Sequence, residues 1–360
     1  MVYYVIGLMS GSSLDGLDIA YVQLEEVRGA WRYDLLAGEC IPYSQDWEHK
    51  LKHASGMHVS EFLKLHTAYG RYLGHHVADF MNRHHLEHKV HFISSHGHTV
   101  FHEPGNRTTF QLGDGASIAA AVQLPVVSDL RAMDVALGGQ GAPIVPIGDQ
   151  LLFGRYEYLL NIGGIANMTV WQDGQPIAFD VCAANQVLNA LAEREGMTMD
   201  KGGAMAAQGN MLYGVLDRLN AVDYYKRPAP KSLSNEDAMA SVFPVLLESS
   251  NDTKDMLHTA TVHIARQVAL AAAKYPHNKD EAHMLVTGGG AFNNFLIKEL
   301  QRELALLKID VVVPDADVIK YKEAIVMALI GTLRWREEAN VLSSVTGASA
   351  DSINGALWMV

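Results

Sequence analysis

The strongest constraint on the fold is a pair of similar segments, each with an apolar run, a glycine-containing turn and a second apolar run. One covers residues 5–22 and turns at Ser10-Gly11-Ser12-Ser13, and the other covers residues 159–171 and turns at Gly163-Gly164. Two strands around such a turn form a β-hairpin. Each hairpin opens roughly one half of the chain, so we interpret the pair as a weak internal duplication.

Outside the hairpins, strands alternate with helices. Apolar residues recur every three or four positions over residues 59–86, which predicts an amphipathic helix. Apolar runs predict further strands at 90–94, 125–128, 177–180, 284–287 and 310–313, and helices at 115–122, 185–194, 210–221, 258–274, 292–304 and 322–338. The alternation predicts an α/β protein with mainly parallel sheet. The stretch Ala136–Pro146 is rich in glycine and proline, which suits a hinge where the chain crosses between domains.

The composition is that of an ordinary globular protein. The 360 residues are 49% hydrophobic and 19% charged, which is enough chain for two domains. A net charge of −12 without a dense Lys/Arg stripe argues against nucleic acid or an anionic membrane as partner. The apolar runs are also far shorter than the ~20 residues of a membrane helix. Cys40 and Cys182 make neither a disulfide framework nor a zinc site, which favours the reducing cytoplasm.

The glycine turns suit phosphate. A turn rich in Gly and Ser exposes backbone N–H groups, and two such turns facing each other across a cleft would bind the β- and γ-phosphates of a nucleotide. Asp15 and Asp18 lie in or beside the first turn, which is compatible with a polyphosphate if Mg²⁺ lies between them. A third turn, Gly288-Gly289-Gly290, joins a strand to a helix and would allow close approach of adenosine. Any single turn of this kind is equally explained as purely structural. The sequence has no G-x-x-x-x-G-K-[ST] motif, which excludes a P-loop.

Longer motifs support a more specific interpretation. In order, they are Gly7-Leu-Met-Ser-Gly-Ser-Ser-Leu-Asp-Gly-Leu-Asp18, Ser95-His-Gly-His-Thr-Val-Phe-His-Glu-Pro104, Gln111-Leu-Gly-Asp-Gly115, Asp129-Leu-Arg131, Leu137-Gly-Gly-Gln-Gly-Ala-Pro143, Asn161-Ile-Gly-Gly-Ile-Ala-Asn167, Pro228-Ala-Pro-Lys-Ser232, Gly288-Gly-Gly290 and Ser343-Ser-Val-Thr-Gly-Ala-Ser349. Nearly end to end, the chain resembles the anhydro-N-acetylmuramic acid kinase family, part of the sugar kinase, actin and heat-shock ATPase superfamily.

The resemblance implies a fold and an activity. The fold would be a two-lobed, actin-like (ribonuclease H-like) α/β fold with duplicated mixed sheets flanked by helices. Lobe I would comprise residues 1–130 and 335–360, and lobe II residues 131–334. Members use ATP, here expected with Mg²⁺, to open 1,6-anhydro-N-acetylmuramic acid with water and phosphorylate O6. The product would be N-acetylmuramic acid 6-phosphate, in cell-wall (peptidoglycan) recycling.

The resemblance also assigns the nucleotide site. The ATP-binding residues would be Gly11, Ser12, Ser13, Leu14, Asp15, Gly16, Leu17 and Asp18 of the phosphate loop, Gly163, Gly164 and Asn167 of the second hairpin, and Gly288, Gly289 and Gly290 at the adenosine. Asp15 would hold Mg²⁺, directly or through water.

The family's catalytic aspartate corresponds to Asp180. The family block, Tyr/Phe-Asp-Thr-Gly-Pro-Gly-Asn, is Phe179-Asp-Val-Cys-Ala-Ala-Asn185 here, so the aspartate and asparagine match while the four residues between them differ. A further family aspartate corresponds to Asn189. A carboxylate at the end of a strand can take a proton from water or from a sugar hydroxyl. From spacing alone, Asp180 is equally well explained as a turn residue or helix N-cap.

Five residues are candidates for binding the sugar: His96, Thr99, Arg131, Asn185 and Glu323. Arg131 suits a carboxylate or the transferring phosphate, and a structural ion pair is the alternative. The pair His96-x-His98 lacks the carboxylates of a metal site, so hydrogen bonding is favoured over metal binding. Glu323 is also explained by the helix dipole, because it opens a helix.

Two other functions remain open at this stage. The altered block after Asp180 is compatible with a kinase of the same fold that acts on an ordinary sugar hydroxyl. A non-enzymatic, ATP-gated binding protein is the second alternative, although the chain lacks the peptide-binding domain of such chaperones. The expected partner is a small-molecule amino sugar, and the sequence leaves a homodimer open.

Overall fold

The chain forms two compact units. The computed structural model describes residues 1–11, 14–172, 174–229, 231–248 and 252–360. Unit 1 comprises Met1–Leu152 and Tyr321–Val360, and unit 2 comprises Phe153–Lys320. The boundaries of these units differ from those of the lobes expected from the sequence. Residues 131–152 and 321–334 belong to unit 1, whereas they were expected in lobe II.

The sheet of unit 1 is mixed. Its strands are β1 (Val2–Ser10), β2 (Leu17–Val27), β3 (Ala30–Ile41), β4 (Phe92–Glu103), β5 (Thr108–Leu112), β6 (Val126–Ser128) and β12 (Ala356–Trp358). The order is β12-β6-β4-β1-β2-β3, with β5 paired to β4. β2 is antiparallel to both of its neighbours, β1 and β3. β4 is parallel to both of its neighbours, β1 and β6.

The sheet of unit 2 repeats this plan. Its strands are β7 (Tyr158–Ile162), β8 (Ile165–Gln172), β9 (Gln175–Ala183), β10 (Ala282–Thr287) and β11 (Ile309–Val312), in the order β11-β10-β7-β8-β9. A three-stranded antiparallel meander again lies beside two parallel strands. The duplicated ribonuclease H-like arrangement and the α/β class are therefore confirmed. The expectation of mainly parallel sheet is wrong, since the meander makes up much of each sheet.

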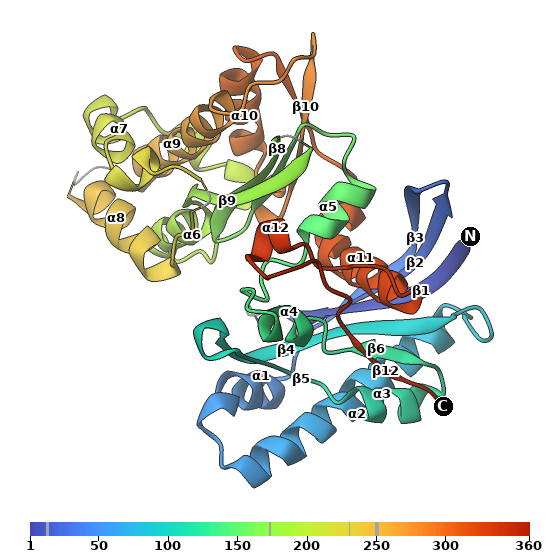
Figure 1. Cartoon of the computed structure of the whole chain (residues 1–360). Coiled ribbons are helices and arrows are strands. Elements are labelled where there is room, and N and C mark those ends of the chain that lie inside the picture. Colours follow the sequence, from blue (N-terminus) through green and yellow to red (C-terminus); the bar gives the residue numbers. More distant parts are fainter. Residues whose placement is uncertain (12–13, 173, 230, 249–251) are drawn as a thin grey trace. The chain divides into compact units, whose positions relative to one another are not determined.

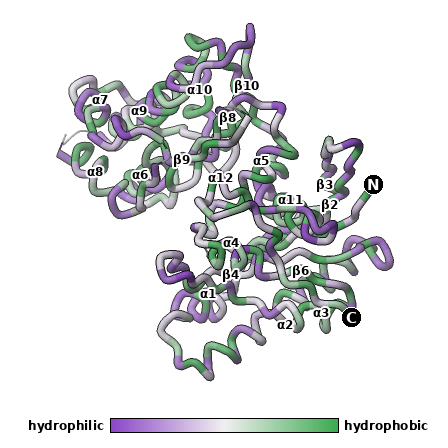
Figure 2. The backbone as a smooth tube through the Cα atoms, in the orientation of Figure 1, coloured by the Kyte–Doolittle hydropathy of each residue, from purple (hydrophilic) through white to green (hydrophobic). Residues whose placement is uncertain are grey.

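The helices of unit 1 cover both faces of its sheet (Figure 1). They are α1 (Gln45–Lys52), α2 (Val59–Arg83), α3 (Gly115–Val122), α4 (Ala132–Ala136), α5 (Pro146–Leu152), α11 (Ala316–Trp335, from Tyr321 onward) and α12 (Ser343–Thr346). Alternation along β1 explains the layering. Ile6 and Leu8 pack into the core with α2, whereas a Cβ atom on Gly7 would lie 1.9 Å from the Ala324 carbonyl of α11. Hydrophilic and hydrophobic stretches alternate along α2 in Figure 2, as the predicted amphipathic helix requires.

The helices of unit 2 are α6 (Asn185–Glu193), α7 (Tyr213–Asn220), α8 (Asn235–Leu247), α9 (Thr253–Ala273) and α10 (Asn294–Ala305). α9 is the central helix, since most of its residues are buried and it packs in one core with β7 to β11 and α6. Eight of the described helices and strands were not predicted from the sequence: β3, α1, β5, α4, α5, α8, α12 and β12. β3 carried a usable signal, because Trp31, Tyr33, Leu35 and Ala37 alternate with other residues.

The predicted crossing at Ala136–Pro146 is wrong. The chain passes between the units at Leu152/Phe153 and Lys320/Tyr321. The glycine-rich stretch is instead bonded within unit 1, because the Gly141 amide donates to Asp134 Oδ2 at 2.7 Å and the Gln140 amide to the Thr346 carbonyl at 2.8 Å. Glycine here serves a tight loop folded onto a buried carboxylate.

Across the residues that the structure describes, no helix has the length and apolar character that crossing a membrane requires.

Replacing Asp134 with alanine should destabilise unit 1. The side chain is fully buried, and it accepts hydrogen bonds from the Gly141 amide and, at 2.7 Å, from the Thr346 hydroxyl. Both donors would lose their acceptor, so we expect the free energy of unfolding to fall by about 3 kcal/mol. Urea unfolding followed by circular dichroism measures this. The control Asp34→Ala changes an exposed residue and should stay within about 0.5 kcal/mol of the native protein. Equal midpoints for the two variants would contradict the structural role of Asp134.

Candidate active site

A buried hydroxyl cluster fixes the end of β1, where the predicted phosphate loop begins. Ser10 Oγ accepts hydrogen bonds from Tyr43 Oη at 2.7 Å and Tyr69 Oη at 2.9 Å, and it lies 3.3 Å from His98 Nδ1. The two tyrosine hydroxyls are themselves 2.6 Å apart. Burial raises the pKa of both tyrosines, to about 12 for Tyr43, so the cluster stays neutral. These hydrogen bonds fix the position of Ser10, where the predicted phosphate loop begins.

The phosphate loop turns back into β2 at a close backbone contact. Leu14 has a positive φ of 60°, and its amide donates to the Gly11 carbonyl at 3.4 Å. A Cβ atom on Gly16 would lie 2.5 Å from the Ile41 carbonyl, so β3 excludes any larger residue there. Leu17 is buried where β2 begins. The predicted residues Ser12 and Ser13 lie outside the described residues.

Three carboxylates of unit 1 influence one another near this loop. Burial raises the pKa of Asp18 to about 6, the Cys40 thiol lowers it through a hydrogen bond, and the negative charges of Glu323 and Asp15 raise it further. The pKa of Glu323 is also raised, chiefly by desolvation, although its side chain is accessible to water. Asp15 is exposed. The repulsion of the Asp18 carboxylate by the charges of Glu323 and Asp15 is relieved by a bound cation.

The donor set fits Mg²⁺ bound mainly through water and phosphate oxygens. Among the described residues, no group of three or more His, Cys, Asp or Glu side chains is arranged to hold a metal ion. Mg²⁺ typically keeps several waters and uses only one or two carboxylates together with substrate phosphates. Asp18 and Asp15 match that need, and of the two the half-buried Asp18 is held more firmly by its surroundings.

Arg131 is held in place by His96. Its Nε donates to His96 Nε2 at 2.8 Å, and its Nη1 donates to the Gly141 carbonyl at 2.6 Å. His96 Nδ1 lies 2.8 Å from the Gly97 carbonyl and must be the protonated nitrogen, since Nε2 accepts from Arg131. Burial, followed by the charge of Arg131, lowers the pKa of His96 to about 3, so the ring is neutral. The structure thus makes His96 a positioning residue for Arg131.

Arg131 lies within the electrostatic influence of Glu323. Burial lowers the pKa of Arg131 to about 10, and the charge of Glu323 raises it. Two of the five substrate candidates, Arg131 and Glu323, therefore influence each other electrostatically, and a third, His96, is hydrogen-bonded to Arg131. The sequence did not predict this interaction, because Arg131 and Glu323 are 192 positions apart in the chain.

A small cavity of about 150 Å³ in unit 1 was not predicted from the sequence. Its walls include Ser95 beside His96, Gln111, and Asp129 on the segment that precedes Arg131. Ser95 Oγ and Gln111 Oε1 are buried and have no hydrogen-bond partner in the described part of the chain, which is costly unless water or a ligand group satisfies them. Thr99 lies close by, since its Oγ1 accepts a long hydrogen bond of 3.5 Å from Gln111 Nε2. Three quoted motifs meet in this cavity.

In unit 2, the two glycine turns lie side by side. Gly288 has a φ of +80°, and a Cβ atom there would lie 2.7 Å from Asn161 Oδ1, at the end of β7. A Cβ atom on Gly290 would lie 2.3 Å from the side chain of Ile162, which directly precedes Gly163. The end of β10 therefore packs against the Gly163-Gly164 turn, and only glycine permits this contact. Gly164 and Gly289 are exposed, so their amides are accessible.

Asn185 joins these two turns. Its Nδ2 donates to the Ile162 carbonyl at 3.0 Å, and its backbone amide donates to the Gly163 carbonyl at 3.1 Å. A Cβ atom on Gly290 would lie 3.3 Å from Asn185 Oδ1. Asn185 therefore orients the two glycine turns that were assigned to the nucleotide. The sequence analysis had predicted only that Asn185 binds the sugar. Asn189 lies one helical turn further along α6.

Asp180 is held by backbone groups near the end of β9. Its Oδ2 accepts from the Leu233 amide at 2.8 Å, and its own amide donates to the Lys231 carbonyl at 3.0 Å. Tyr224 Oη donates to the Asp180 carbonyl at 2.8 Å. Burial raises the pKa of Asp180, while the Leu233 N–H and the charge of Lys231 lower it. One oxygen is anchored, and Oδ1 has no protein partner among the described residues.

A β-bulge sits at the altered block. Asn167 pairs with Asp180 and Ala166 with Cys182, so Val181 is an extra residue in β9. Bulges re-aim side chains beside active sites, and here the bulge turns the strand between Asp180 and Asn185. Val181, Cys182, Ala183 and Ala184 are all buried, so the replacements of the family's residues pack into the core.

Comparisons of the sequence with known proteins identify its family. The sequence profile of the family described as anhydro-N-acetylmuramic acid kinase matches residues 3–360. A relative from Francisella tularensis subsp. novicida is 32% identical, with 98% of this chain and 97% of that protein covered. One from Synechococcus elongatus is also 32% identical, with 98% of each covered. Both carry the name "Anhydro-N-acetylmuramic acid kinase".

Similar solved structures are more distant. The activator of the 2-hydroxyisocaproyl-CoA dehydratase from Clostridium difficile with bound ADPNP has a TM-score of 0.47 at 14% identity, covering 93% of this chain and 96% of that one. A ROK family glucokinase from Streptomyces griseus has a TM-score of 0.41 at 10% identity, covering 91% and 98%.

The fold and the family profile together define a phosphotransferase that acts on a sugar hydroxyl. The chain belongs to the anhydro-N-acetylmuramic acid kinase family.

The two cysteines should differ sharply toward a thiol reagent. Cys40 is exposed on β3, and its thiol donates a hydrogen bond to Asp18. Cys182 is fully buried, and burial raises its pKa to about 12. We expect one label per native chain, on Cys40, and a second label only after denaturation. Mass spectrometry counts the labels, and Cys40→Ser should leave the native protein unlabelled. Native labelling of Cys182 would contradict this.

Proposed function

We propose that this protein opens 1,6-anhydro-N-acetylmuramic acid with water and transfers the γ-phosphoryl group of ATP to O6. The product is N-acetylmuramic acid 6-phosphate, formed in the cytoplasm during peptidoglycan recycling. Family membership over residues 3–360 supports the reaction class. The observation that carries the proposal is Asp180, a half-buried carboxylate fixed through Oδ2 with Oδ1 left to act on a substrate.

Asp180 is the general base in this proposal. Its Oδ1 takes a proton from a water molecule as the water oxygen bonds to the anomeric carbon. The bond from that carbon to O6 breaks, and the electron pair stays on O6. O6 then bonds to the γ-phosphorus as the bond from that phosphorus to ADP breaks. The Leu233 amide, 2.8 Å from Oδ2, holds the carboxylate so that its orientation needs no rearrangement.

The glycine turns serve the nucleotide. In unit 1, Gly11 to Asp18 bind phosphate through backbone amides. In unit 2, Gly163, Gly164 and Asn167 are assigned the same role. Gly288 to Gly290 lie at the adenosine, with Asn185 fixing the second and third turns relative to each other. Mg²⁺, when bound through Asp18 and Asp15, screens the charge of the transferring phosphoryl group.

Unit 1 also carries sugar-binding groups. Arg131, held by His96 and the Gly141 carbonyl, suits the carboxylate that N-acetylmuramic acid bears. Glu323 accepts hydrogen bonds from hydroxyls. The cavity with the unpartnered Ser95 Oγ and Gln111 Oε1, beside Thr99, takes a polar substituent of the sugar.

Product analysis separates the three functions considered from the sequence. The protein is incubated with ATP, Mg²⁺ and either 1,6-anhydro-N-acetylmuramic acid or N-acetylmuramic acid, and products are weighed by mass spectrometry. The proposal predicts a product from the anhydro sugar that gains both water and a phosphoryl group. A phosphoryl gain from the ordinary sugar alone identifies a hydroxyl kinase. No transfer to either sugar indicates a binding protein, and both of these outcomes overturn the proposal.

Asp180→Asn tests the base. We expect kcat to fall by about 10³-fold or more, because the amide cannot accept the proton, while ATP binding is retained. A matched control is Asp217→Asn, an exposed aspartate on α7 in the same unit, which should keep full activity. Isothermal titration with an ATP analogue checks nucleotide binding. Normal turnover in Asp180→Asn would reject the assignment.

Labelling of Cys40 tests the phosphate loop without relying on turnover. The Cys40 thiol contacts Asp18, so Mg²⁺-ATP bound at the loop should slow its alkylation several-fold at pH 7.5. Protection should weaken below about pH 6, because Asp18, whose pKa is about 6, then becomes protonated and attracts Mg²⁺ less. In Asp18→Asn this pH dependence should disappear. Alkylation at the same rate with and without Mg²⁺-ATP would place the nucleotide elsewhere.

A further inference from the structure

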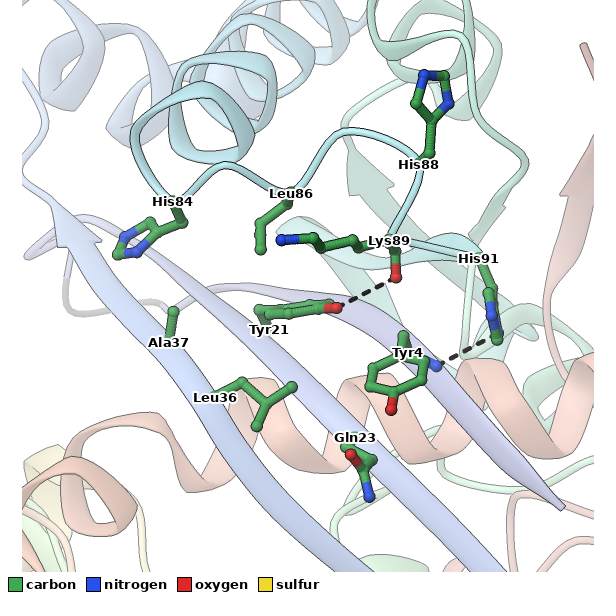
Figure 3. Close-up of a pocket in the computed structure, with 10 residues that line it drawn as sticks. All are labelled: Tyr4, Tyr21, Gln23, Leu36, Ala37, His84, Leu86, His88, Lys89 and His91. Carbon is green, nitrogen blue, oxygen red and sulfur yellow. Dashed lines mark hydrogen bonds between the residues drawn. The ribbon is translucent and has the colours of Figure 1, made fainter.

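A second cavity, of about 560 Å³, lies on unit 1 at the other end of β1 from the phosphate loop (Figure 3). Its walls come from the three antiparallel strands and from residues 84–91, which join α2 to β4. Tyr4 lies in this cavity and Ser10 ends the strand, so about 20 Å separates it from the loop along β1. The volume falls within the usual range for sites that bind small molecules.

The cavity exists because α2 ends before the strands do. Arg83 and His84, at the end of α2, bond to Glu39 of β3 at 2.5 and 2.7 Å. Leu36 and Ala37, which precede Glu39 in β3, line the cavity beyond the end of this helix. A β-bulge adds to the opening, because Tyr21 pairs with Ala37 and Val22 with Leu35, which leaves Leu36 as an extra residue. Leu36 is 48% exposed and faces the cavity.

Donors and flat rings line this space, with the Lys89 ammonium group directed toward Leu86 and His84 and the His91 ring on the opposite side (Figure 3). The backbone amide of Tyr4 donates to His91 Nδ1 at 3.3 Å, so the other ring nitrogen, Nε2, carries the proton and can donate. Figure 3 shows the Lys89 side chain running above the ring of Tyr21. Tyr21 Oη is already used, on the Lys89 carbonyl at 3.1 Å. The Lys89 ammonium group, Tyr4 Oη and the Gln23 amide have no hydrogen-bond partner among the described residues.

The charge of the cavity is opposite to that of the whole chain. The chain has a formal net charge of −12, yet no Asp or Glu is among the described residues that line this cavity. Its titratable side chains, apart from the two tyrosines, are Lys89 and the imidazoles of His84, His88 and His91. Glu39, beside the rim, is already paired with Arg83 and His84. A local basic site on an acidic protein favours a small anion.

We propose that this cavity binds a sugar phosphate as a second ligand site, separate from the site of phosphoryl transfer. The phosphate accepts a charge-assisted hydrogen bond from the Lys89 ammonium group. On the opposite side of the cavity, His91 Nε2–H donates to an oxygen of the sugar. The ring lies against Tyr4, Tyr21 and Leu36, and its hydroxyls reach Tyr4 Oη and the Gln23 amide. The inference does not depend on which sugar the kinase site uses, so it goes beyond the proposed function.

Methyl NMR of the full-length protein tests the proposal, with Leu36 as a reporter inside the cavity. N-acetylglucosamine 6-phosphate is titrated into protein with ¹³C-labelled leucine methyl groups, and Leu36→Ala assigns the signal. Leu63, exposed on α2 away from the cavity, is the internal control. We expect the Leu36 methyls to shift with a saturable curve and Leu63 to stay in place. Neutral N-acetylglucosamine and inorganic phosphate should each bind at least tenfold more weakly.

Two matched variants connect the shift to the basic group. Lys89→Met keeps the aliphatic stem and removes the charge, so it should weaken the Leu36 titration by tenfold or more. Lys64→Met makes the same change at an exposed position on α2 and should leave the titration unchanged. The proposal is overturned if the Leu36 methyls do not move at millimolar sugar phosphate, if the neutral sugar moves them equally, or if Lys89→Met binds as the native protein does.

Discussion

Close backbone contacts at glycine position the candidate site in both units. In unit 1, the absence of a side chain at Gly7 lets β1 lie directly against α11, and the absence of one at Gly16 lets the phosphate loop return beside β3. In unit 2, Gly288 and Gly290 let the end of β10 pack against the end of β7. A Cβ atom at any of these four glycines would prevent the observed contact. The loops assigned to ATP are therefore set by packing of the strands beneath them, and their exposed amides need little reorganisation to bind an anion.

The pKa values of three candidate site carboxyls, Asp18, Glu323 and Asp180, are raised. The pKa of Asp18 is raised by burial and by the charges of Glu323 and Asp15. Desolvation raises the pKa of Glu323, while the charges of Lys322 and Arg131 lower it. Burial disfavours the charged form of Asp180 and raises its pKa, and the hydrogen bond from the Leu233 amide partly offsets this effect. A bound cation or a substrate donor stabilises such carboxylates more than it stabilises solvated ones. This arrangement is typical of functional sites, where perturbed titration marks groups prepared for a ligand.

Much of the site could be predicted from the sequence because its residues lie in local patterns. Glycine turns between apolar runs are visible at short range, and the structure places each of them at a strand end. Asp180 could be assigned from one motif, although the bulge at Val181 that turns its strand could not. Strand β3 was missed despite its alternation, and the predicted crossing at Ala136–Pro146 was wrong because glycine there serves a loop bonded to buried Asp134. Glycine and proline indicate where a chain can bend, and they do not indicate which unit the bend belongs to.

The sequence by itself determined the α/β class, the duplicated hairpins and the short motifs, since each depends on residues that are neighbours along the chain. Tertiary structure decided which distant residues meet. It set His96 against Arg131 and brought Glu323 within their influence, placed the Cys40 thiol on Asp18, and left Ser95 and Gln111 facing a shared cavity. The physical reason is that such pairs form only when strands and helices pack, and no periodicity in the chain records the distance between side chains on different elements.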